Sequence, residues 1–110
     1  MHQSLEVRLA AAGIQLVAET TSHYLFTRDN FIALVERATD SIGSTGMLME
    51  HGLAYLIWRD GRAYLKSKGA ENPATDEQVV AIRQFSQDLE SALSGTAPLR
   101  SRLGATEPRP

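Results

Sequence analysis

The clearest hydrophobic pattern along the chain lies in residues 53–68, which read LAYLIWRDGRAYLKSK. Two runs rich in aromatic and aliphatic residues flank Asp60-Gly61, a dipeptide that favours the tight turn of a β-hairpin. The segment holds the only tryptophan, Trp58, and two of the three tyrosines of the chain. The pattern therefore predicts a hairpin that helps to build the hydrophobic core.

The loop length decides which side chains of this hairpin share a face. With a two-residue loop, Arg59 pairs with Arg62, and one face carries the small and apolar residues Ala54, Leu56, Trp58, Ala63, Leu65 and Ser67. The other face carries Leu53, Tyr55, Ile57, Arg59, Arg62, Tyr64, Lys66 and Lys68. A three-residue loop would shift the second strand by one residue. We favour the two-residue loop, because it separates apolar from basic side chains better, and we expect Trp58, Leu56 and Leu65 to pack in the core.

Apolar residues at spacings of four and three predict a short helix from Leu5 to about Ala12, with Ser4 as its N-cap. Residues 14–20 then alternate between apolar and polar positions, which predicts a strand with one mostly buried face. A polar turn separates this strand from a second one, predicted over the residues HYLFT at 23–27. The N-terminal quarter is therefore expected to be a helix followed by two strands.

The segment 31–42 fits two patterns. The run FIALV over 31–35 is short, continuously apolar and rich in residues that suit sheets, which predicts a strand after a tight loop at 28–30. On a helix, the apolar residues of the same segment would share one face and its charged residues the other. We favour the strand and keep the helix as the alternative.

The segments before and after the hairpin are shorter. Residues 42–46 (IGSTG) read as a flexible turn, 47–50 as a short strand and 69–74 (GAENPA) as a connector. Thr75 and Gln78 then have the spacing of a capping box. They open a helix with the apolar stripe Val79, Ile82, Phe85, Leu89, Ala92 and Leu93.

The fold class follows from these elements. They predict an α+β domain over residues 1–94: an antiparallel β-meander of about five to six strands, with a short N-terminal helix and a long C-terminal helix packed on one face. Residues 95–110 are rich in proline, glycine and arginine and poor in apolar residues. We expect them to form a disordered tail, because they cannot repay the entropy of ordering.

Composition excludes several classes of function. The chain has no cysteine, which rules out thiolate catalysis and cysteine-ligated metals and suits a reducing compartment. No apolar run approaches the roughly 20 residues of a membrane span, and the first residues lack the pattern of a secretory signal. We therefore expect a cytoplasmic protein without a membrane partner. The formal charge is −2, and the last seventeen residues carry three arginines against one glutamate. The remaining body is thus mildly acidic, which argues against tight non-specific nucleic-acid binding.

No motif points to catalysis or to a cofactor. The glycine-rich patterns of phosphate-binding loops are missing, and no serine lies in a nucleophile elbow. The three histidines, His2, His23 and His51, show no spacing typical of a metal site. We expect a protein that is not an enzyme and that binds no cofactor or metal.

The mixed aromatic and basic face of the hairpin is the candidate partner-binding surface. Its residues are Tyr55, Ile57, Arg59, Arg62, Tyr64 and Lys66. Tyrosine and arginine are typical of interface hot spots, and a half-apolar sheet face is typical of dimers. An ordinary solvated sheet face, with lysines that prevent edge-to-edge aggregation, is the alternative. We expect a protein partner or a second copy of the chain in a homodimer.

The segment Gly43-Ser44-Thr45-Gly46 resembles the GXXG loop of KH RNA-binding domains, in which a loop between two helices grips nucleotide phosphates. The resemblance covers about eight residues, and Ser44 and Thr45 stand where the family usually has a basic residue. It implies an alternative function: an RNA-binding domain that uses the Gly43–Gly46 loop together with the basic and aromatic hairpin.

The order of the elements also resembles known families in layout. With 31–42 as a helix, the layout is similar to that of profilin-like and roadblock-type adaptors. With 31–35 as a strand, it is similar to that of the small acidic α/β chaperones of type III secretion. Both resemblances imply a small, non-enzymatic and often dimeric binding module. The expected function is therefore that of an adaptor- or chaperone-like protein-interaction domain that self-associates.

Overall fold

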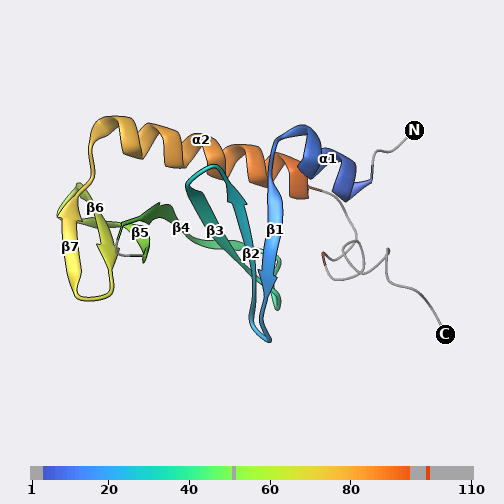
Figure 1. The fold of residues 1–110 in the computed structure, drawn as a ribbon, viewed down its shortest axis with the longest axis horizontal. Helices are drawn as coiled ribbons and strands as arrows, with labels where there is room; N and C mark the ends of the chain where they lie inside the picture. The colour runs from blue at the N-terminus through green and yellow to red at the C-terminus, as the bar shows by residue number, and fades with distance from the viewer. Residues whose placement is uncertain (1–3, 51, 95–98, 100–110) are drawn as a thin grey trace.

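The protein forms one seven-stranded antiparallel sheet with a helix before it and a helix after it (Figure 1). The computed structural model describes residues 4–50, 52–94 and 99. The elements follow in the order α1 (Leu5–Ala11), β1 (Gln15–Glu19), β2 (His23–Arg28), β3 (Phe31–Glu36), β4 (Ile42–Met49), β5 (Gly52–Arg59), β6 (Arg62–Ser67), β7 (Ala70–Pro73) and α2 (Asp76–Leu93). The predicted α+β meander with two terminal helices is confirmed, with seven strands instead of five to six.

The central hairpin has the predicted register. Asp60 and Gly61 have φ angles of 53° and 78°, the positive values that a two-residue turn of type I′ requires. Arg59 pairs with Arg62, and Trp58 pairs with Ala63. The two-residue loop is therefore confirmed, and the three-residue alternative is wrong.

The run FIALV forms the third strand and not a helix. Asp29 has a positive φ of 55°, which closes a tight turn and pairs Arg28 with Phe31. The strand lies between β2 and β4. Its consecutive residues Ile32 and Ala33 are both buried, although their side chains point to opposite faces of the sheet. Burial on both faces explains why this strand lacks an alternating pattern.

Two segments that were predicted as a turn and a connector form strands. Residues 42–46 belong to the long strand β4, and residues 70–73 form the edge strand β7, where a proline is tolerated. Gly46 lies where β4 and β5 approach closely, because a Cβ atom on Gly46 would collide with the backbone of Ala54. Gly46, which suggested a flexible turn in the sequence, instead allows β4 and β5 to pack closely.

β1 lies at the opposite edge of the sheet, and all five of its residues are exposed. The prediction of one mostly buried face is wrong, because α2 packs mainly against β3 and β4. A register shift between Leu16 and Ala18 also interrupts the alternation of side chains. Ile14, just before the strand, is buried and anchors this part of the chain.

α2 begins at the predicted capping box and crosses one face of the sheet (Figure 1). The Gln78 amide donates to Thr75 Oγ1 over 3.1 Å, and the Thr75 amide donates to Gln78 Oε1 over 2.9 Å. The buried residues of the helix are Ile82, Phe85, Leu89, Ala92 and Leu93, which match the predicted stripe except for Val79, which is only partly buried. The apolar stripe therefore holds the helix on the sheet.

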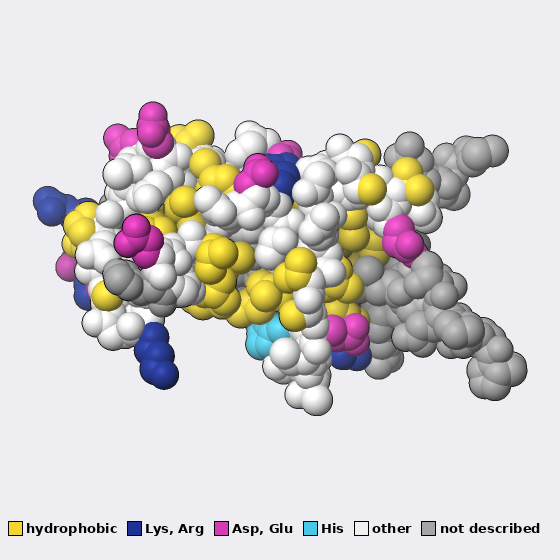
Figure 2. All heavy atoms as spheres, viewed as in Figure 1, with side chains coloured by type: hydrophobic (Ala, Val, Ile, Leu, Met, Phe, Trp, Pro, Cys, Tyr) yellow, Lys and Arg dark blue, Asp and Glu magenta, His cyan; other side chains and the backbone are white. Residues whose placement is uncertain are grey.

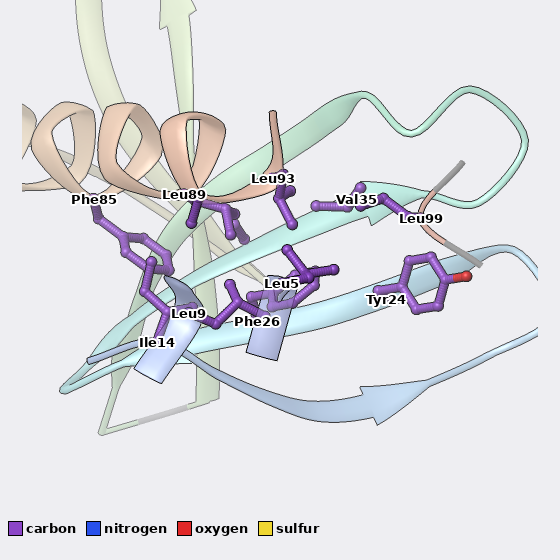
Figure 3. Packing of buried hydrophobic residues seen from close by; sticks show 12 residues of the cluster. Leu5, Leu9, Ile14, Tyr24, Phe26, Val35, Phe85, Leu89, Leu93 and Leu99 are labelled. Carbon is purple, nitrogen blue, oxygen red and sulfur yellow. The ribbon is translucent and has the colours of Figure 1, made fainter. Parts of the chain in front are cut away.

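The core consists of two clusters of unequal size. The larger cluster joins α1, β2, β3 and the C-terminal half of α2 through Leu5, Leu9, Ile14, Tyr24, Phe26, Ala33, Val35, Phe85, Leu89, Ala92, Leu93 and Leu99 (Figure 3). The smaller cluster consists of Ala54 on β5, Leu65 on β6 and Ile82 on α2. Leu65 is buried as predicted and Leu56 packs against the cluster, whereas Trp58 is 51% exposed. The prediction that Trp58 packs in the core is wrong.

Leu99 belongs to the larger cluster although it lies in the predicted disordered tail. Its side chain is buried, and its amide donates to Asp40 Oδ2 over 3.0 Å. Residues 95–98 and 100–110, which make up the rest of the predicted tail, lie outside the described residues. At Leu99 the chain contacts the core, a contact that the composition of this segment did not predict.

Candidate interaction surface

The sheet has two faces of different character. Phe26, Val35 and Leu65 point toward α2 and are buried. We call the opposite side the outer face, and strand alternation with the observed register places these apolar residues on it: Leu25, Ile32, Leu34, Leu48, Leu53, Tyr55, Ile57 and Tyr64. Among the described elements, no helix makes a substantial contact with it. Ile32 is nevertheless buried within this face, Leu48 is 51% exposed, and the other six residues are partly buried. Figure 2 shows hydrophobic side chains gathered across the middle of the molecule, with Lys and Arg side chains at the end formed by β5–β7.

All six predicted partner-binding residues lie on the outer face, in register across β5 and β6. Tyr55 pairs with Lys66, Ile57 with Tyr64 and Arg59 with Arg62. The structure therefore brings together Tyr55, Ile57, Arg59, Arg62, Tyr64 and Lys66 as one continuous surface. Their role as a partner-binding surface stays a prediction.

One basic residue of this surface is already paired. Arg59 makes a two-pronged ion pair with Glu71 on β7, with nitrogen–oxygen distances of 2.5 and 3.2 Å. Its guanidinium carbon also lies 6.0 Å from the centroid of the Tyr64 ring. Arg62 and Lys66 have no ion pair within the described part of the chain. The free positive charge of the surface thus comes from Arg62 and Lys66.

A hollow of about 640 Å³ opens on the outer face over β5 and β6. Its lining residues are Leu53, Tyr55, Ile57, Lys66, Ser67 and Lys68. In the observed register, Gly46 on β4 lies between Ile32 on β3 and Tyr55 on β5. Because glycine has no side chain, it leaves a gap in the row of side chains beside the hollow. The outer face therefore has an apolar centre with a recess, bordered by lysines.

A second hollow of about 470 Å³ lies between the tip of the β5–β6 hairpin and the first turns of α2. We call it the tryptophan cleft. Its lining residues are Trp58, Gly61, Arg62, Ala63, Tyr64, Pro73, Ala74, Asp76, Val79 and Val80. Trp58 is 51% exposed and Val80 is 67% exposed. The guanidinium carbon of Arg83 lies 4.9 Å from the centroid of the Trp58 ring, which is a cation–π contact.

Sequence reasoning missed the tryptophan cleft because it placed Trp58 in the core. Alternation along β5 correctly assigns Trp58 to the face toward α2, but it does not tell how far the helix covers that face. One signal was present in the sequence. Val80 and Arg83 are three residues apart and share a helix face outside the apolar stripe.

The described residues contain no group of three or more His, Asp or Glu side chains that could hold a metal ion. His51, considered above as a histidine without metal-site spacing, lies outside them. The pKa of Asp88 is lowered, chiefly by its hydrogen bond with Arg28, and this pair ties α2 to β2. Within the described residues, no helix is long and apolar enough to cross a membrane.

The segment compared with the KH loop has a different setting in the structure. Gly43 to Gly46 lie inside β4 and do not join two helices. The layout with a helix at 31–42, compared above with profilin-like and roadblock-type adaptors, is not the one observed. The RNA-binding alternative stays a prediction, but the loop on which it depended is absent.

The fold and its uncovered face define the class of protein: an α+β domain in which a long helix backs one side of an antiparallel meander. Comparison with known proteins adds no family, because no protein-family model, no curated protein and no solved structure matches the chain.

Proposed function

We propose that this chain is a non-enzymatic protein-interaction domain, adaptor- or chaperone-like, that self-associates through the outer face of its sheet. The observation that carries the proposal is the apolar composition of that face, where Leu48 is 51% exposed and no described helix makes a substantial contact, while α2 covers the other side. Contiguous apolar surface on a folded domain is typical of an interaction site, because its burial removes unfavourable contact with water.

The charges around the apolar centre favour a second copy as the partner. Glu36 lies exposed at the β3 side of the outer face, whereas Arg62 and Lys66 lie exposed at the β6 side. In a two-fold symmetric dimer with its axis near β4, the basic side of each copy lies over the acidic side of the other. The same surface thereby complements itself in charge.

The other parts of the proposal rest on composition. The absence of cysteine supports a cytoplasmic location, and the absence of a catalytic motif supports a binding role. No observation of the structure favours RNA as the partner, since the predicted loop is part of β4.

The solution mass tests the proposal. Sedimentation equilibrium over a wide concentration range is expected to show a dimer of the 12.0 kDa chain. Tyr55→Asp places a charge in the apolar centre and is expected to weaken dimerisation by about a hundredfold, because burial of an unpaired charge costs several kcal/mol. Far-UV circular dichroism of the variant verifies that the sheet is retained.

Val80→Asp is the matched control for this measurement. It introduces the same charge at an exposed apolar residue of α2, on the other side of the sheet, and is expected to leave the dimer unchanged. A mass of one chain at every concentration would contradict the proposal. A dimer that Tyr55→Asp does not weaken would place the interface elsewhere and also contradict it.

A further inference from the structure

The tryptophan cleft carries an inference that does not depend on dimerisation through the outer face. Its volume of about 470 Å³ lies within the range of about 300–1,000 Å³ that ligand pockets occupy. Its apolar residues include Trp58 and Val80, both more than half exposed. A large aromatic ring left half in water at the mouth of a hollow is typical of an anchor point for a partner.

The arginines at this cleft differ from the other described arginines. Arg8 donates to the Ser91 carbonyl, Arg28 pairs with Asp88, Arg37 with Glu19 and Arg59 with Glu71, so each of these side chains is joined to an oxygen acceptor. Arg62, which lines the cleft, and Arg83, which stacks on Trp58, have no such acceptor among the residues that the structure describes.

We infer that the tryptophan cleft binds a short acidic peptide segment of a partner protein that presents one apolar side chain. The apolar side chain packs against Trp58 and Val80, and a flanking carboxylate binds Arg83. Arginine matches this role, since its planar guanidinium can bind a carboxylate through two parallel hydrogen bonds. Association is then assisted by a local positive charge on a chain whose net charge is negative.

The charges of the cleft also argue against a cationic occupant. Arg83 already covers one side of the Trp58 ring, so a second cation would meet a like charge there. Asp76, at the start of α2, is the one acidic residue among those that line the cleft. Its negative charge disfavours an acidic residue of a bound segment beside the start of α2.

Trp58 supplies a direct measurement, because it is the only tryptophan of the chain. The probe is a blocked pentapeptide with a central leucine between two pairs of glutamates, titrated into the full chain while tryptophan fluorescence is recorded. We expect a saturable change. A peptide with glutamines in place of the glutamates is expected to bind about tenfold more weakly, and so is a peptide with alanine in place of the leucine. High salt is also expected to weaken binding of the original peptide about tenfold.

Protein variants then locate the site. Arg83→Gln is expected to weaken binding about tenfold, and Val80→Asp more strongly, because it places a negative charge in the cleft. Arg37→Gln and Val7→Asp are the matched controls: Arg37 is already paired with Glu19 at the other end of the sheet, and Val7 is an exposed valine on α1. Both are expected to change binding by less than about twofold. Isothermal titration calorimetry checks these values without relying on the fluorescence, which Arg83→Gln itself alters.

Three outcomes would overturn the inference: no saturable binding up to millimolar peptide, equal binding of the glutamine peptide, or tighter binding of a short single-stranded RNA such as hexauridylate. The result is separable from that for the proposed function. Tyr55→Asp is expected to weaken the dimer and to leave peptide binding intact. Val80→Asp is expected to leave the dimer intact and to weaken peptide binding.

Discussion

The two ends of the sheet are both backed by α2 and yet differ in the depth of their core. At the β1–β3 end, the C-terminal half of α2, the helix α1 and Leu99 all contribute to the larger cluster (Figure 3). At the β5–β7 end, the described residues provide only the N-terminal half of α2 as cover, and the smaller cluster consists of three buried side chains. The core is deeper at the β1–β3 end because α1 and Leu99 pack there together with α2.

This difference explains where the candidate surfaces lie. Side chains at the thin end remain accessible, among them Trp58 and Val80 in the cleft and Tyr55 and Ile57 on the outer face. At the deep end, residues of comparable size such as Tyr24 and Phe26 are fully buried. Stability is thus concentrated at one end of the domain, and surface for partners at the other.

The largest expected effect comes from removing one leucine from each end. Leu89→Ala in the larger cluster is expected to lower the free energy of unfolding by about 4 kcal/mol, and Leu65→Ala in the smaller cluster by about 2.5 kcal/mol. Both leucines are buried, but a thin core can collapse further into the space left behind. Urea denaturation measures both values. Equal losses would contradict the contrast between the two ends.

A smaller effect is expected at Trp58. Trp58→Ala is expected to cost about 1 kcal/mol, compared with about 3–5 kcal/mol for a buried tryptophan, because half of the side chain already contacts water. The loss consists of apolar contact and of the stacking with Arg83. Trp58→Phe, which keeps an aromatic ring, is the matched control and is expected to cost about half as much. A loss as large as that of Leu89→Ala would show that Trp58 belongs to the core.

Local rules were enough to predict much of the fold. Asp60-Gly61 favours a turn that sets the register of β5 and β6, and Thr75 with Gln78 marks the start of α2. The common face of Tyr55, Ile57, Arg59, Arg62, Tyr64 and Lys66 follows from that register alone, so this candidate surface was predictable. Each of these predictions depends on residues close together in the sequence.

The errors arise where distant segments decide the outcome. Gly46 reads as a flexible position, but it is required by the approach of the neighbouring strand β5. Trp58 lies on the predicted face, yet its exposure depends on where α2 begins to cross the sheet. The tryptophan cleft joins the hairpin tip to the first turns of α2, so neither segment alone predicts it.

The smallest expected effect tests the deep end through pH. Arg28 links three parts of this end: it donates to the Ala12 carbonyl over 3.2 Å, pairs with Asp88 over 2.8 Å and stacks on Phe85. The hydrogen bonds from Arg28 and Gln84 hold the pKa of Asp88 below its ordinary value of 3.8. Since the folded form binds the proton less readily, the stabilisation by this carboxylate is present above about pH 4 and is lost as the pH falls through the folded pKa.

Asp88→Asn removes this dependence. The variant is expected to lose at most about 1 kcal/mol at pH 6, because the pair is partly exposed and screened by solvent. Between pH 4 and pH 3, its free energy of unfolding is expected to fall less steeply than that of the unchanged chain, as measured by urea denaturation at each pH. The same slope in both proteins would show that Asp88 adds no pH-dependent stability.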